Sequence, residues 1–89
     1  MLKKEITIVN KLGLHARAAA KFVSLASSFS SDIGLSRDSK RVNGKSIMGV
    51  MMLAASKRTV LELSADGSDE QLAIERIEEL IQNRFGEES

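Results

Sequence analysis

Hydrophobic residues along the first half of the chain follow two different periods. Residues 4–9 are rich in β-branched side chains and place Ile6 and Ile8 on one side, which predicts a strand. From residue 16 the spacing of the hydrophobic positions changes to three and four, as in an amphipathic helix. Small polar residues at 27–32 predict the end of that helix.

A hairpin and a short helix are predicted next. Residues 33–36 alternate, the pair Asp38–Ser39 interrupts the pattern, and residues 40–42 resume it, which is typical of a short hairpin. Asn43–Gly44 is a turn signal. Ser46 directly precedes the apolar run 47–53, so we expect it to be the N-cap of a short helix.

The last third of the chain predicts one strand and one helix. Residues 59–65 alternate as a half-buried strand, and Asp66–Gly67 then turns the chain. Ser68 and Gln71 have capping-box spacing at the start of an amphipathic helix that we expect to end at Gly86. The order β-α-β-β-α-β-α predicts an α+β fold, with an antiparallel sheet and the helices packed on one side.

Length and composition exclude several kinds of site that the protein could otherwise contain. Eighty-nine residues are enough for one domain spanning residues 1–89, and 43% hydrophobic with 28% charged residues is ordinary for a globular protein. The chain has no Cys, Pro, Trp or Tyr and a single histidine, His15. Disulfides, thiol nucleophiles, zinc fingers, iron–sulfur sites and paired-histidine zinc sites are therefore excluded, and we expect no bound metal.

The distribution of apolar residues favours a cytoplasmic protein with no membrane insertion. The longest apolar run, residues 47–55, is far shorter than a membrane span. The lysines near the N-terminus are not followed by the hydrophobic region of a signal peptide.

Charge is divided unevenly along the chain. Residues 1–58 carry eleven Lys and Arg against three acids, whereas the remaining residues carry two Arg against nine acids. This division favours a surface that attracts a phosphate, a polyanion or an acidic protein. Acidic residues on one solvated helix would explain it equally well.

His15 stands at the entrance of the first predicted helix, with Arg17 two residues later. The first N–H groups of a helix, here those of Ala16, Arg17 and Ala18, lack internal partners, and the helix dipole stabilises a phosphate there. The same field disfavours a protonated imidazole, and a neutral imidazole is a nucleophile. Arg17 is placed to neutralise a phosphoryl group. The spacing alone would also fit a histidine that is only a polar cap or loop residue. A hydrolase in which His15 activates a serine is less well supported, because the sequence contains no nucleophile-elbow pattern.

Two segments resemble the motifs of the HPr family, the histidine-containing phosphocarriers of the bacterial phosphotransferase system. They are Gly13–Arg17 and Val42–Met51, and the resemblance extends over the whole chain. It implies four antiparallel strands under three helices. It also implies that His15 receives a phosphoryl group on Nδ1 from phosphorylated enzyme I and passes it to a histidine of an enzyme IIA component.

The resemblance further implies a carrier rather than an enzyme, without a bound cofactor. Phosphoenolpyruvate and Mg²⁺ would belong to enzyme I, and we expect a monomer. One position departs from the family pattern, because Ala18 stands where proline is usual. Losing a proline in the first helical turn costs less than about 1 kcal/mol, so we expect phosphorylation to survive.

Ser46 has a structural and a regulatory interpretation. The letters Gly44–Ser46 do not form a phosphate-binding P-loop, because residue 39 is Ser rather than the required Gly. A role as helix N-cap explains Ser46 sufficiently. The resemblance adds that Ser46 matches the serine modified by HPr kinase/phosphorylase, whose phosphate would add about two negative charges beside a docking face.

The run 47–53 contains six apolar side chains, too many for one face of a two-turn helix. We expect about four of them in the core. The others, together with Leu14, would form an exposed patch that docks an acidic protein, with Met48 and Met51 as contacts. The basic rim would consist of Arg17, Lys21, Lys45 and Lys57.

Two other functions stay open at this point. One is a nucleic-acid or small-ligand binding α+β domain that uses the basic surface. Only three aromatic residues are present, all Phe, and two fall on helix faces expected to be buried, so no stacking platform for bases is visible and we expect no nucleic-acid partner. The other is a regulatory phosphorelay within the same family.

Overall fold

The order of the elements matches the β-α-β-β-α-β-α order predicted from the sequence. The computed structural model describes residues 1–89 and adds one 3₁₀ turn, η1, near the C-terminus. The strands are β1 Leu2–Thr7, β2 Asp32–Arg37, β3 Lys40–Asn43 and β4 Val60–Asp66. The helices are α1 Ala16–Ser27, α2 Ile47–Met52, α3 Glu70–Gln82 and η1 Arg84–Gly86.

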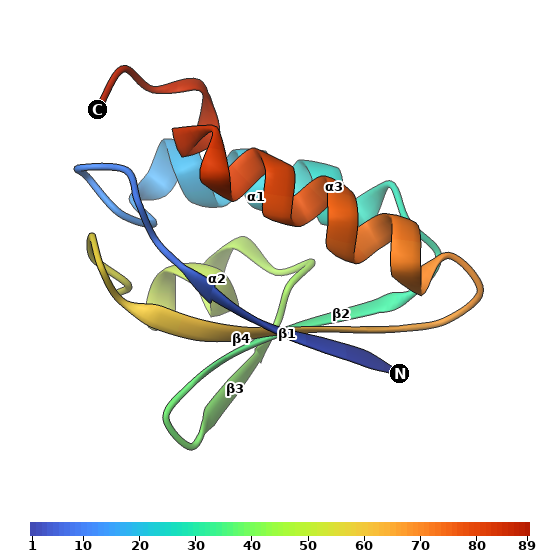
Figure 1. Cartoon of the computed structure of the whole chain (residues 1–89). Coiled ribbons are helices and arrows are strands. Elements are labelled where there is room, and N and C mark those ends of the chain that lie inside the picture. Colours follow the sequence, from blue (N-terminus) through green and yellow to red (C-terminus); the bar gives the residue numbers. More distant parts are fainter.

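The four strands form one antiparallel sheet in the order β1-β4-β2-β3. Figure 1 shows α1 and α3 side by side over one face of this sheet, with α2 on the same side. The other face is uncovered. This arrangement confirms the predicted α+β class, with three helices on one side of an antiparallel sheet.

Alternation along the strands decides which side chains enter the core. Ile6 pairs with Leu61, and Leu35 with Leu63, and all four side chains are buried under the helices. Phe22 of α1 is completely buried against this layer. The buried apolar side chains form one cluster of 21 residues, so the helices are held to the sheet by a single continuous core.

The predicted capping box at the start of α3 is wrong. The carboxylate of Asp69, the residue before α3, accepts hydrogen bonds from the N–H groups of Ser30 (2.9 Å) and Ser31 (3.0 Å) and from the Ser31 hydroxyl. The side chain of Glu70 accepts from the Gly67 N–H at 3.3 Å. The start of α3 is therefore tied to the loop between α1 and β2, a contact that local spacing does not encode.

The end of α3 also differs from the prediction. The helix stops at Gln82 instead of reaching Gly86, because Arg84 and Phe85 adopt positive φ values of 56° and 54°. This turn directs the Phe85 side chain into the core, where it is 1% exposed. Burial of the aromatic ring offsets the cost of the left-handed backbone.

Asp69 should make stability depend on pH in the acid range. Its hydrogen bonds, that from the Ser31 hydroxyl first, lower the pKa of this carboxyl from 3.8 to about 2. A lowered folded-state pKa gives stability that is present above about pH 4 and lost as the pH falls towards 2. We expect Asp69→Asn to unfold at lower urea concentration near neutral pH, with a difference from the unmodified chain that shrinks towards pH 2. An equal difference at both pH values would contradict this assignment.

Two further features bear on function. Four of the nine acids in the C-terminal part lie on α3, and the others are spread over β4 and the neighbouring loops, so the acidic charge is not confined to one helix. None of the helices combines the length and the hydrophobicity needed to cross a lipid bilayer.

Candidate functional site

His15 is the N-cap residue of α1, as the sequence predicted. Its backbone is extended (φ −69°, ψ 176°), and the first helical hydrogen bond runs from the Ala19 N–H to the His15 carbonyl at 2.8 Å. The three preceding N–H groups, those of Ala16, Arg17 and Ala18, have no acceptor within the helix. The imidazole therefore lies at the positive end of the helix dipole.

A tightly packed loop, residues 10–14, holds His15 in this position. Gly13 has φ 66°, and a Cβ there would lie 2.8 Å from the Cα of Ser56, so only glycine fits. The Leu14 N–H donates to the Ala55 carbonyl at 2.8 Å. The buried Asn10 side-chain amide donates to the Gly13 carbonyl, also at 2.8 Å, and closes the loop.

The C-terminal segment brings a carboxylate to the imidazole. Glu87 Oε2 contacts His15 Nε2, and Glu87 Oε1 accepts from Asn10 Nδ2 at 3.1 Å. The side chains of His15 and Glu87 are 29% and 16% exposed. Two residues separated by 72 positions in the chain thus form one partly buried pair.

The charge state of Glu87 follows from its donors. The hydrogen bond from His15, followed by that from Asn10, outweighs partial burial and lowers the pKa of the Glu87 carboxyl below its usual value. An ionised carboxylate only accepts hydrogen bonds, so the hydrogen in the contact belongs to Nε2 of His15.

The second ring nitrogen of His15 is free. Nδ1 makes no hydrogen bond to the protein, and the only buried side-chain polar atom without a partner is Asn10 Oδ1. Nδ1 is therefore accessible to solvent. A neutral imidazole with hydrogen on Nε2 has its lone pair on Nδ1, which makes Nδ1 the nucleophilic atom.

Arg17 is exposed and forms neither an ion pair nor a hydrogen bond, so its guanidinium is available to an anion at the start of α1. Lys21, one turn further along, donates to the Phe85 carbonyl at 2.6 Å. That hydrogen bond fastens the C-terminal segment to α1, a role that the sequence pattern did not indicate.

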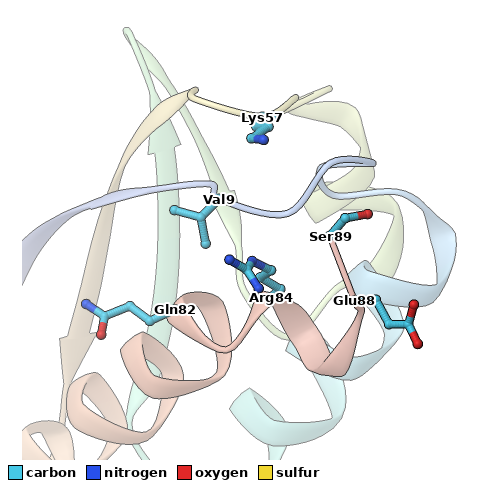
Figure 2. Close-up of a pocket in the computed structure, with 6 residues that line it drawn as sticks. All are labelled: Val9, Lys57, Gln82, Arg84, Glu88 and Ser89. Atoms are coloured by element: carbon cyan, nitrogen blue, oxygen red, sulfur yellow. The ribbon is translucent and has the colours of Figure 1, made fainter.

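The remaining C-terminal residues lead away from the imidazole. Figure 2 shows Glu88 and Ser89 at a pocket that is shared with Lys57 and Arg84 and does not include His15. The backbone carbonyl of Ser89 accepts from the Lys11 N–H at 2.9 Å. Of the last three residues, only Glu87 contacts the candidate site through its side chain.

Sequence reasoning missed Asn10 and Glu87. Neither stands in a motif, and the contact between Glu87 and His15 exists only because Phe85 anchors the C-terminal segment in the core. A buried asparagine after a strand and a glutamate near the chain end carry no local signal of this kind.

Ser46 is the N-cap of α2, as predicted, and its hydroxyl accepts from the Gly49 N–H at 3.1 Å. The apolar run that follows is more exposed than expected. Only Val50 and Leu53 enter the core, instead of about four side chains, because α2 has six residues and turns one narrow face inward. The large apolar side chains left exposed on α2 are Ile47, Met48, Met51 and Met52.

Leu14 does not belong to the exposed patch, and this prediction was wrong. Its side chain is 5% exposed, because the loop that holds His15 turns it into the core. Met48 and Met51, at 76% and 42% exposed, lie on the surface as expected. We define the α2 patch as the four exposed residues Ile47, Met48, Met51 and Met52.

None of the predicted rim cations forms an ion pair. They are Arg17, Lys21, Lys45 and Lys57, and Lys45 donates to the Phe29 carbonyl at 2.8 Å. Two cations not singled out in the sequence lie at the end of α2. Arg37 donates to the carbonyls of Leu53 and Ala54, and Lys40 to that of Met52.

Comparisons with known proteins agree with this fold. A family model described as the PTS HPr component phosphorylation site matches residues 2–83. The chain is 56% identical over 87 residues to the phosphocarrier protein HPr of Neisseria meningitidis serogroup A, covering 98% of each chain. It is 53% identical over 89 residues to the HPr of Xylella fastidiosa strain Temecula1, covering 100% of both.

Solved structures give the same result. A crystal structure of HPr-C-His from Thermoanaerobacter tengcongensis matches with a TM-score of 0.96 and 53% identity over 100% of both chains. Fold and sequence thus define a phosphocarrier of the phosphotransferase system. The chain belongs to the HPr family.

A second structure from T. tengcongensis is described as an HPr dimer. It matches with a TM-score of 0.79 and 53% identity, over 98% of this chain and 100% of that one. The monomer expected here stays a prediction.

Proposed function

We propose that His15 accepts a phosphoryl group on Nδ1 from phosphorylated enzyme I and passes it to a histidine of an enzyme IIA component. In the first step the Nδ1 lone pair forms a nitrogen–phosphorus bond. The bond from phosphorus to the donor imidazole breaks, and its electron pair stays on the donor. The second step repeats this exchange with His15 as the donor.

The observation that carries this proposal is the placement of a free Nδ1 at the N-terminus of α1. Three N–H groups without helical acceptors and the unpaired Arg17 are available to the phosphoryl oxygens. Phosphoryl transfer depends mainly on positioning and on stabilising the charge of these oxygens. These N–H groups and Arg17 would serve both purposes.

Transfer of the phosphoryl group to the chain and from the chain to enzyme IIA can be tested with purified partners. The chain is phosphorylated with enzyme I and labelled phosphoenolpyruvate, separated from enzyme I, and mixed with an enzyme IIA. We expect alkali-stable, acid-labile label on the chain and its transfer to enzyme IIA. Label that never leaves the chain for any enzyme IIA tried, or a chain that takes up none, would contradict the carrier role.

We further propose that the α2 patch docks both partners, with Met48 and Met51 as contacts. The patch consists of exposed apolar side chains, with Lys45 just before α2 and with Arg37 and Lys40 on the backbone at its end. None of these cations forms an ion pair, so the surface suits an acidic protein. Flexible methionine side chains also adapt to unlike partners. Leu14 is not included, because it is buried.

We propose that phosphorylation of Ser46 by an HPr kinase/phosphorylase regulates this docking. Ser46 precedes the α2 patch, so a phosphate there adds negative charge beside the surface that meets an acidic partner. We expect Ser46→Asp to be phosphorylated by enzyme I about tenfold more slowly, which corresponds to about 1.4 kcal/mol of lost docking free energy.

The matched control is Ser46→Asn, which keeps an N-cap side chain without adding charge. It should be phosphorylated at the rate of the unmodified chain. Equal rates for Ser46→Asp and Ser46→Asn would remove charge repulsion as the mechanism.

No observation favours the nucleic-acid alternative. Phe22, Phe29 and Phe85 are all buried, so the surface offers no aromatic ring on which a base could stack.

A further inference from the structure

We propose that Glu87 is a positioning residue for His15: its carboxylate, held by Asn10, keeps the ring hydrogen on Nε2 and thereby keeps Nδ1 ready to accept phosphorus. This inference rests on the phosphocarrier function proposed above. It assigns a role to a residue outside both family-like motifs, five positions from the end of α3.

The side chain of Asn10 fixes the position of the Glu87 carboxylate. Asn10 is completely buried, and its Nδ2 donates both to the Gly13 carbonyl at 2.8 Å and to Glu87 Oε1 at 3.1 Å. Rotating the Asn10 amide by half a turn would place its oxygen against the Gly13 carbonyl. The Asn10 donor therefore points permanently at Glu87.

The C-terminal backbone that carries Glu87 is equally fixed. The buried Phe85 ring anchors it in the core, and Lys21 donates to the Phe85 carbonyl at 2.6 Å. The Glu87 N–H donates to the Arg84 carbonyl at 2.9 Å. Because these contacts fix the segment, the carboxylate reaches the imidazole in a defined orientation.

Each oxygen of the Glu87 carboxylate accepts one hydrogen bond. Oε1 accepts from Asn10, and Oε2 accepts from Nε2 of His15. Because a carboxylate has no hydrogen to donate, the imidazole must carry its hydrogen on Nε2. The carboxylate also faces the ring as it gains positive charge, which happens when Nδ1 uses its lone pair to bind phosphorus. An oriented carboxylate behind a functional histidine has this combined effect in Ser-His-Asp triads.

Glutamine at position 87 cannot satisfy both donors. If its oxygen accepts from Asn10, its NH₂ group faces Nε2 and requires a lone pair there, which moves the ring hydrogen to Nδ1. If its oxygen accepts from His15, its NH₂ group faces the NH₂ group of Asn10. We therefore expect Glu87→Gln to raise the population of the tautomer with hydrogen on Nδ1, which is not nucleophilic at that atom.

The first test uses the unphosphorylated chain and needs no partner protein. The ¹⁵N chemical shifts of the His15 ring, measured at alkaline pH where the imidazole is neutral, report which nitrogen carries hydrogen. The unmodified chain should show hydrogen predominantly on Nε2, and Glu87→Gln should shift the balance towards Nδ1. The matched control is Glu88→Gln, which removes the same charge from the next residue, whose side chain does not contact His15.

The second test measures phosphorylation of the same three chains by enzyme I. Loss of a group that orients a functional histidine costs 10- to 100-fold at metal sites, and we expect kcat for Glu87→Gln to fall about tenfold. KM should not change, because the α2 patch is untouched. Glu88→Gln should match the unmodified chain in both parameters.

Unchanged ring shifts and an unchanged kcat in Glu87→Gln would overturn the assignment. A raised KM with unchanged kcat in Glu87→Gln would also overturn it, and so would an equal effect of Glu88→Gln. Both results would indicate a general effect of the lost charge. If the unmodified chain accepted no phosphate, the proposed function would fail, whereas the tautomer measurement would still test the role of Glu87.

Discussion

Replacing His15 with alanine is expected to abolish phosphorylation by enzyme I and phosphoenolpyruvate. His15 is the only imidazole, and the chain has no cysteine, so no other side chain can replace a nitrogen nucleophile of this kind. The N–H groups at the start of α1 and Arg17 would remain, but they only bind phosphoryl oxygens. We expect incorporation of labelled phosphate to fall by at least about 10³-fold, the scale seen when a nucleophile is removed.

The fold of His15→Ala should persist, because the side chain is partly exposed and its backbone makes the capping hydrogen bond to Ala19. Urea unfolding of the variant serves as the control. A folded His15→Ala chain that still accepts phosphate at the wild-type level would contradict the central role of His15.

Replacing Phe85 with alanine is expected to cause a large loss of stability. The ring is 1% exposed, and truncating a buried phenylalanine costs about 3–5 kcal/mol. A domain of this size has about 5–15 kcal/mol in total, so the midpoint of urea unfolding should fall substantially. The turn with positive φ at residues 84 and 85 would also lose the burial that stabilises it.

Leu72→Ala is the matched control for Phe85→Ala. Leu72 lies on α3 and is 47% exposed, and Leu and Ala have similar helix propensities, so we expect a change within about 0.5 kcal/mol. If Phe85→Ala unfolded at the same urea concentration as Leu72→Ala, Phe85 could not be the anchor of the C-terminal segment.

Local signals predicted the starts of α1 and α2 correctly. A change of hydrophobic period placed His15 before α1, and a serine before an apolar run placed Ser46 before α2. Both predictions succeed because these two starts are determined by the residue and its immediate neighbours. The start of α3 differs, because Asp69 there binds a distant loop. The element order followed in the same way from alternating and helical spacing.

The errors concern contacts between distant segments. Asp69 binds Ser30 and Ser31 across 38 or 39 positions, and Glu87 binds His15 across 72. The burial of Leu14 depends on how the loop after β1 packs against residue 55. Periodicity within one element cannot report such packing, so the residue that orients His15 became visible only in the folded chain.

The α2 patch shows a second reason why periodicity in the sequence did not predict every exposed residue. Six apolar side chains among the seven residues 47–53 indicated that some must be exposed, but a helix of six residues is too short for its period to show which ones. The structure resolves this by turning Val50 inward and leaving Met48 and Met51 at the surface.

Locating the phosphate on the chain tests the central claim most directly. The chain is incubated with enzyme I and phosphoenolpyruvate, digested under alkaline conditions that preserve phosphohistidine, and the modified residue is identified by mass spectrometry. The account predicts one phosphoryl group, carried by His15. Phosphate on another residue, or none on a chain that enzyme I contacts, would contradict it.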